Sequence, residues 1–138
     1  MDEYLNLIAR EAEPFDPQMA SRIRSLPELL NVSEDAAVEE LLKNSTITGS
    51  PIGDIVAVAI FAFLKHRDDF ARSVQFCVNA GWDTDTMAAM NGAICGAWNG
   101  VDGIPTRNIT NLENGYKGRD YIRNLADQQA SGKFGSPR

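Results

Sequence analysis

Two aspartates and two threonines lie within four residues in the stretch Gly81-Trp82-Asp83-Thr84-Asp85-Thr86. Asp83 and Asp85 flank a single residue, so at a turn or a helix N-terminus their carboxylates can converge on one point. Hard cations such as Mg²⁺ bind carboxylate and hydroxyl oxygens, with water completing the coordination shell. The alternative is a helix N-cap, in which an Asp or Thr side chain accepts amide hydrogen bonds. One acid suffices for a cap, so the second acid favours a cation site.

The segment after this stretch consists largely of small residues. Gly92, Gly96 and Gly100 recur at every fourth position, with alanines between them. Because glycine costs a helix about 1 kcal/mol relative to alanine, three glycines on one face predict that neighbouring helices approach this backbone closely. The sequence therefore predicts a cation-binding loop that precedes a central, closely packed helix.

Composition excludes several classes of protein. The chain has 138 residues, 43% of them hydrophobic, which suits one domain or part of a larger one. The formal net charge of −6 argues against a nucleic-acid partner, since no basic patch is present to neutralise phosphates. The longest apolar run, 55–64, is too short to span a bilayer, which takes about 20 residues. We therefore expect no membrane association. Cys77 and Cys95 lack metal-ligand spacing, so we expect buried, reduced thiols, which suit a cytoplasmic location.

Apolar residues recur at helical spacing through most of the chain, and no segment alternates as a strand does. Pro14 and Pro27 are expected to end the first two helices, Asp54 to cap a strongly apolar helix, and His66 to be solvated in the last turn of that helix. The fold class is therefore all-α. The expected helices cover residues 1–12, 16–27, 33–43, 55–66, 69–78, 83–100 and 116–129. Residues 1–130 are expected to form the folded portion and 131–138 a flexible tail.

A polar loop over residues 44–53 has two interpretations. It is either a connector between helices or a ligand-binding loop, in which Gly49 and Ser50 contact a polar ligand through backbone and hydroxyl groups. Binding groups concentrate on loops that a rigid scaffold holds in place.

Other chemistries that use closely spaced aspartates fit poorly. A dehalogenase-type aspartyl nucleophile needs alternating strands and helices, which are missing from the pattern. An EF-hand needs a Gly and a terminal Glu at fixed spacing after the first Asp. The glycines lie four apart inside a helix, unlike those of a phosphate-binding loop.

The segment 79–100, Asn-Ala-Gly-Trp-Asp-Thr-Asp-Thr-Met-Ala-Ala-Met-Asn-Gly-Ala-Ile-Cys-Gly-Ala-Trp-Asn-Gly, resembles the C-terminal signature of the ADP-ribosylglycohydrolase family. Ile104-Pro105 just beyond it extends the resemblance. The resemblance implies an all-α helical bundle, of the orthogonal type and incomplete in this chain. It also implies a two-metal site, with Mg²⁺ or Mn²⁺, and hydrolysis of the glycosidic bond that joins ADP-ribose to a protein or small molecule.

Carried over by position, Asp83, Asp85 and Thr86 match the family's C-terminal metal ligands, and the two aspartates take the catalytic role. Gly49 and Ser50 fall where family members contact the ribose. Trp82 stands where the family usually has glycine, and its ring is expected either to line the substrate cleft or to alter how the ligand fits.

Nothing in residues 1–80 resembles the family's first metal cluster, a Thr-Asp-Asp motif, or its Gly-Asp-x-x-Gly opening. We therefore expect the C-terminal portion of a family domain, carrying half of the metal site. It is a fragment, a gene product with a displaced start, or a piece that assembles with another chain. Its expected partners are ADP-ribose or an ADP-ribosylated substrate, and an N-terminal half or a second copy of the chain. The alternative is a non-catalytic homologue that acts as a ligand-binding or interaction module.

Overall fold

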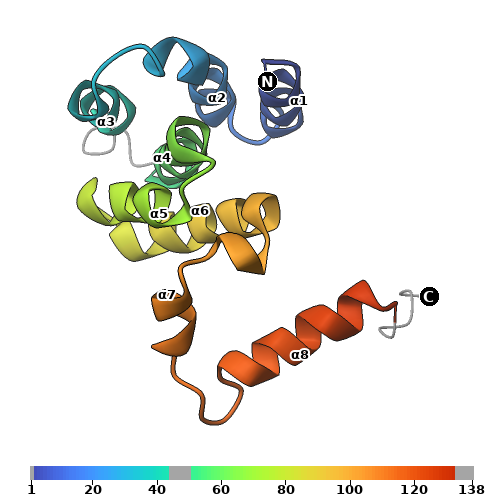
Figure 1. Cartoon of the computed structure of the whole chain (residues 1–138). Coiled ribbons are helices and arrows are strands. Elements are labelled where there is room, and N and C mark those ends of the chain that lie inside the picture. Colours follow the sequence, from blue (N-terminus) through green and yellow to red (C-terminus); the bar gives the residue numbers. More distant parts are fainter. Residues whose placement is uncertain (1, 44–50, 133–138) are drawn as a thin grey trace. The chain divides into compact units, whose positions relative to one another are not determined.

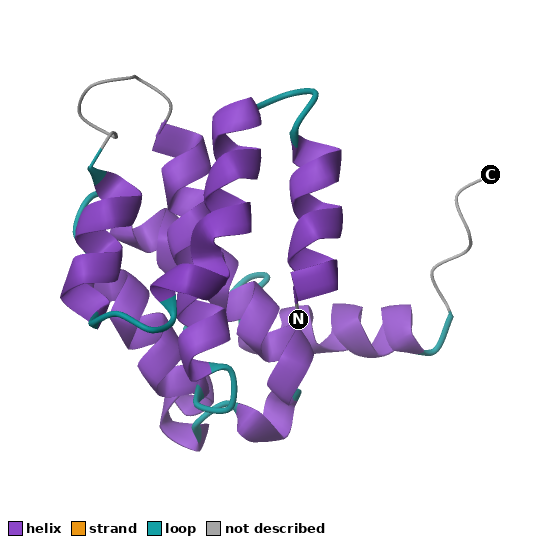
Figure 2. Cartoon of the chain, turned by 90° about the horizontal axis from the view of Figure 1, so that it is seen from above, coloured by secondary structure: helices purple, strands orange, loops and turns teal. Residues whose placement is uncertain are grey.

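The computed structural model describes residues 2–43 and 51–132, and within these ranges all regular structure is helical (Figures 1 and 2). The all-α prediction is therefore confirmed. The chain divides into two compact units, residues 1–103 and 104–138, which are described separately below. The helices of the first unit are α1 (Asp2–Ala12), α2 (Pro17–Leu29), α3 (Glu34–Leu42), α4 (Pro51–His66), α5 (Phe70–Asn79), α6 (Thr84–Asn99) and the short 3₁₀ helix η1 (Val101–Gly103).

Helix α4 is the centre of the first unit, because α2, α3, α5 and α6 all pack against it (Figure 1). Its sequence is apolar on nearly every side, which is the pattern of a helix buried all round. Ala57, Val58, Phe61 and Ala62 are fully buried. The surrounding helices contribute one stripe each to the same core, including Ile23 and Leu26 of α2 and Leu41 of α3 as well as Phe76 of α5 and Met87 of α6.

The start of α4 differs from the prediction. The helix begins at Pro51, so Asp54 lies within its first turn and is not its N-cap. Proline is well suited to the first turn, where its missing N–H would have no intrahelical partner. The Asp54 side chain is 1% exposed and forms an ion pair with Arg22 of α2. This carboxylate joins two helices in the core.

Two further predictions about helix ends were wrong. Helix α2 continues through Pro27 to Leu29, because burial of Ile23 and Leu26 holds its apolar stripe on the core despite the lost hydrogen bond. The His66 side chain is only 9% exposed, and its Nε2 lies 3.1 Å from Glu34 Oε1. The last turn of α4 therefore packs against the start of α3, where solvent was expected.

The small-residue face of α6 is less closely packed than its glycines predicted. Helix α6 packs on α4 and α5. A Cβ atom on Gly92 would lie 3.9 Å from Val74, whereas Gly96 and Gly100 have no neighbour within 4 Å in the described part of the chain. Within these ranges, close approach to another helix does not explain the two later glycines.

The second unit contains α7 (Thr106–Thr110) and α8 (Arg119–Ala130). The sequence did not predict α7, and α8 begins three residues after the expected start at Tyr116. Lys117 has a φ of +58°, and the Gly118 that follows caps α8. The Asn114 side chain donates to Asp120 Oδ2 at 2.7 Å and so joins the preceding loop to the helix. Of the expected tail, residues 131–132 form a turn and 133–138 lie outside the described residues.

Two compositional expectations can also be compared with the structure. Cys77 and Cys95 are free and buried, as predicted. No helix in the described ranges has the length and apolar character needed to cross a membrane.

Candidate functional site

A tight turn between α5 and α6 presents the aspartates of the 81–86 stretch. Gly81 and Trp82 adopt φ values of +84° and +65°, and the Thr84 N–H donates to the Trp82 carbonyl at 2.9 Å. The chain therefore reverses direction between the two helices. Glycine reaches the left-handed region freely, whereas a residue with a Cβ pays about 1–2 kcal/mol there. Trp82 is thus held in an unfavourable backbone conformation directly before the first aspartate.

Asp83 is the N-cap of α6. Its Oδ1 accepts a hydrogen bond from the Thr86 backbone N–H at 3.4 Å. The pKa of Asp83 is held below its ordinary value, first by a hydrogen bond from the Thr86 side chain and next by a hydrogen bond with the Asp85 side chain. The turn therefore brings Asp83, Asp85 and Thr86 into one cluster, and all three side chains are exposed to solvent.

Trp82 is also solvent-exposed, with 57% of its surface accessible. Trp82 directly precedes Asp83 in the same turn, so its exposed ring is accessible to a ligand that approaches the two carboxylates. The other two predicted substrate contacts, Gly49 and Ser50, lie outside the described residues.

A buried polar cluster fixes α6 beneath the turn. Asn91, about two helical turns after Asp83, donates from Nδ2 to the Ala59 carbonyl of α4 and to Ser73 Oγ of α5, both at 3.0 Å. Cys95 Sγ contacts the same Ser73 hydroxyl at 3.2 Å. Because unpaired polar groups in a core are costly, this network specifies one packing of α4, α5 and α6. Sequence reasoning missed Asn91, whose signal is a polar side chain within a small-residue helix.

The acid cluster fits a hard cation in donor chemistry. Two carboxylates and a hydroxyl are the oxygen ligands that Mg²⁺ prefers. The positive end of the α6 dipole opposes a cation at this position, so both carboxylates are needed to offset it. In the described ranges, however, no three His, Cys, Asp or Glu side chains are grouped to hold a metal. The cluster itself offers two carboxylates and one hydroxyl.

The arrangement is that of an all-α protein with an exposed Asp-x-Asp-Thr turn mounted on a fixed helix. Residues 1–137 match the family model of ADP-ribosylglycohydrolase, so the chain belongs to this family.

Several curated proteins are similar to the chain, and one of those below is named as an ADP-ribosylhydrolase. An uncharacterised protein of Archaeoglobus fulgidus is 33% identical over 129 residues, which cover 91% of this chain and 37% of the relative. Human ADP-ribosylhydrolase ARH3 is 31% identical over 112 residues, covering 72% of this chain and 30% of the relative. The uncharacterised protein YegU of Escherichia coli is 33% identical over 103 residues, covering 70% and 31%.

The chain thus spans about a third of the length of the curated relatives that it matches. No solved structure matches it significantly.

Proposed function

We propose that this chain carries the Asp-x-Asp-Thr part of a metal-dependent site that hydrolyses the glycosidic bond of an ADP-ribosylated protein or small molecule. The exposed cluster of Asp83, Asp85 and Thr86 on a fixed helix supports this proposal most directly. Family membership and the likeness to a protein named ADP-ribosylhydrolase support the substrate class.

In the proposed site Asp83, Asp85 and Thr86 hold Mg²⁺, or Mn²⁺ in its place. The metal that these residues would hold would supply two kinds of chemistry, orientation of the ADP-ribose hydroxyls and a lowered pKa for a bound water. Because Asp83 keeps a low pKa, its carboxylate stays charged over the neutral and mildly acidic range. The two carboxylates also favour the positive charge that develops on the ribose as the bond to the leaving group breaks.

Three donors from this chain leave most of a shell of six to eight oxygens to be supplied by water, substrate or another polypeptide segment. We therefore propose that full activity needs an N-terminal half or a second copy that completes the site. In this proposal the exposed Trp82 ring also contacts the ligand, and the contacts of Gly49 and Ser50, which lie outside the described residues, follow from the sequence alone.

A ligand-binding module without catalysis is the second candidate. It rests on the same exposed turn, whose two carboxylates and one hydroxyl can accept hydrogen bonds from a polar ligand without a metal. In this case the Asp-x-Asp-Thr turn and Trp82 bind ADP-ribose, and no bond is broken.

Two measurements on the full chain separate these candidates. The first is release of ADP-ribose from an ADP-ribosylated peptide, with Mg²⁺ and then with EDTA. The second is calorimetric binding of free ADP-ribose. We expect Mg²⁺-dependent binding that Asp83→Asn/Asp85→Asn abolishes, and Mg²⁺-dependent release once the remaining donors are supplied. Glu3→Gln/Glu28→Gln, which removes the same charge elsewhere, is the matched control.

Binding without release under every condition would favour the second candidate. Neither binding nor release by a folded chain, or binding that survives the double Asp variant, would contradict both proposals.

A further inference from the structure

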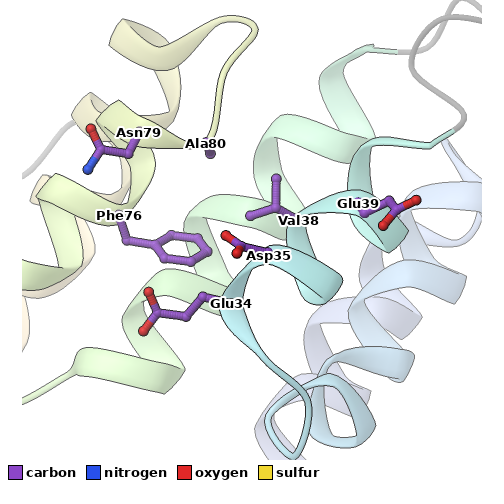
Figure 3. Close-up of a pocket in the computed structure, with 7 residues that line it drawn as sticks. All are labelled: Glu34, Asp35, Val38, Glu39, Phe76, Asn79 and Ala80. Carbon is purple, nitrogen blue, oxygen red and sulfur yellow. The ribbon is translucent and has the colours of Figure 1, made fainter.

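A groove of about 400 Å³ lies between α3 and the C-terminal half of α5 (Figure 3). Its lining combines carboxylates with an apolar surface and one amide. The residues that line it are Glu34, Asp35, Val38 and Glu39 of α3, Phe76 and Asn79 of α5, and Ala80 directly after α5. All of them belong to the first unit of the chain.

Two of the carboxylates at the groove are uncompensated. Glu34 lies 3.3 Å from the Arg72 guanidinium and 3.1 Å from His66 Nε2, so its charge is already paired with that of Arg72. Asp35 and Glu39 lie four residues apart on α3, are exposed, and have no ion-pair partner among the described residues. Acids in the first turn of a helix are common because the dipole favours them. That explanation covers Asp35 but not Glu39, which lies a full turn later.

The apolar part of the groove is a fixed surface. Phe76 is 8% exposed, and its ring lies 5.5 Å from that of Phe61 and 6.0 Å from that of His66. In Figure 3 the Phe76 ring points across the groove toward Asp35 and Val38. A side chain with an apolar stem and a cationic end matches this combination, since Arg and Lys bury their methylenes while keeping the charge beside carboxylates.

The chain runs from the last lining residues of the groove directly into the candidate site. Asn79 and Ala80 directly precede Gly81, and Asp83 lies three residues after Ala80. Three residues span at most about 10 Å of extended chain. An extended peptide can therefore occupy the groove with one residue and reach the Asp83–Asp85 cluster with another residue about three positions away.

We propose that this groove docks the acceptor polypeptide and takes an Arg or Lys side chain within about three residues of the ADP-ribosylated residue. The inference rests on the proposed function for the identity of the partner as an ADP-ribosylated protein. It adds a preference for basic sequence next to the modification, set by Asp35 and Glu39 with Phe76 and Val38 beneath them.

The test measures binding of an unmodified peptide, so that it does not depend on ADP-ribose, metal or turnover. A dye-labelled Gly-Arg-Ser-Arg-Gly peptide is titrated with the full chain at low ionic strength and followed by fluorescence anisotropy. Its Gly-Gln-Ser-Gln-Gly counterpart is the control ligand. We expect Asp35→Asn/Glu39→Gln to weaken binding of the Arg peptide by about fivefold or more, as the loss of two partly exposed charge pairs implies.

The matched control variant Glu3→Gln/Glu28→Gln has the same net charge and is expected to bind like the unaltered chain. Val38→Ala tests the apolar surface and is expected to weaken binding without changing the charge. Circular dichroism melts establish that each variant is folded.

Equal weakening by both double variants would show that only overall charge attracts the peptide and would overturn the proposal. Equal binding of the Gln peptide would also overturn the proposal. So would displacement of the Arg peptide by Mg²⁺ in the unaltered chain but not in Asp35→Asn/Glu39→Gln, because these carboxylates would then bind a cation. Failure of ADP-ribose release alone would instead contradict the hydrolase proposal and leave the peptide result unchanged.

Discussion

Two acidic regions of this chain have opposite surroundings. Asp54, in the first turn of α4, is buried and paired with Arg22. Asp83 and Asp85, at the start of α6, are exposed, and the described residues show no ion pair for either of them. In sequence the two regions look alike, since each places acid near the beginning of an apolar or small-residue helix.

The difference shows which acid is available to a ligand. A buried carboxylate with a cationic partner has its charge satisfied, and removing the partner leaves an uncompensated charge in the core. The exposed pair can exchange water for a cation without disturbing the core. The comparison therefore assigns a structural role to Asp54 and shows that the Asp83 and Asp85 side chains are accessible from solvent.

The strongest test of the comparison is Asp54→Ala. Because it leaves the buried Arg22 without its partner, we expect it to lower the free energy of unfolding by about 3–5 kcal/mol, measured by urea denaturation. Asp83→Asn/Asp85→Asn is the matched change at the exposed site. We expect it to shift the urea midpoint far less, since asparagine keeps a capping oxygen.

A similar loss of stability in both variants would contradict this division between a structural and a binding acid. Arg22→Met/Asp54→Leu refines the test, because it removes both charges together. It should recover much of the stability if an unpaired charge is the cause.

The sequence predicted the fold class and most helices because periodic apolar residues report burial of one face. It also predicted the Asp-x-Asp-Thr turn, whose residues lie within six positions of one another. Helix starts at Pro51 and the continuation through Pro27 were not predicted. At Pro27, burial against other helices overrides the local breaking tendency of proline, and a single sequence does not reveal which helices meet. At Pro51, proline is compatible with the first turn, but the polar residues before it gave no sign that the helix begins there.

For the same reason, the sequence did not predict contacts between residues that lie far apart in the chain. Arg22 and Asp54 are 32 positions apart, as are Asn91 and Ala59. No local pattern distinguishes Asp54 from an N-cap, or His66 from a solvated residue in a last helical turn. The roles of the predicted site residues remain predictions, and for Gly49 and Ser50 so does their position.

A smaller effect on stability is expected from substitutions of Trp82. Two variants of this residue separate the contribution of backbone strain from that of ligand contact. Trp82→Ala removes the ring but keeps a Cβ at a φ of +65°. Trp82→Gly removes both. We expect the glycine variant to be more stable than the alanine variant by about 1 kcal/mol in urea denaturation, because glycine avoids the left-handed penalty.

Both Trp82 variants should lose affinity for ADP-ribose to the same extent if the ring contacts the ligand. Unchanged affinity in both would remove Trp82 from the proposed site. An alanine variant as stable as the glycine variant would show that the turn relaxes without its left-handed residue.

The smallest expected effect on stability concerns His66, whose exposure lies between that of buried Asp54 and that of exposed Asp83. Burial lowers its pKa below the ordinary value of 6.5, with Arg72 and Lys65 lowering it further and Glu34 opposing them. The unfolded chain therefore takes up the proton first as pH falls. The contribution of His66 to stability is complete above about pH 6.5 and is lost as the pH decreases toward the folded-state pKa.

The measurement is the urea midpoint at about pH 7.5 and pH 5.5, where histidine is the side chain that normally titrates. His66 is the only histidine in the chain, so His66→Gln should flatten the difference between the two values. A midpoint that rises as pH falls, and that becomes flat in His66→Gln, would show that the ion pair with Glu34 outweighs burial. His66 would then resemble Arg22 at the buried acid, with its charge retained by a carboxylate partner and not suppressed by the core.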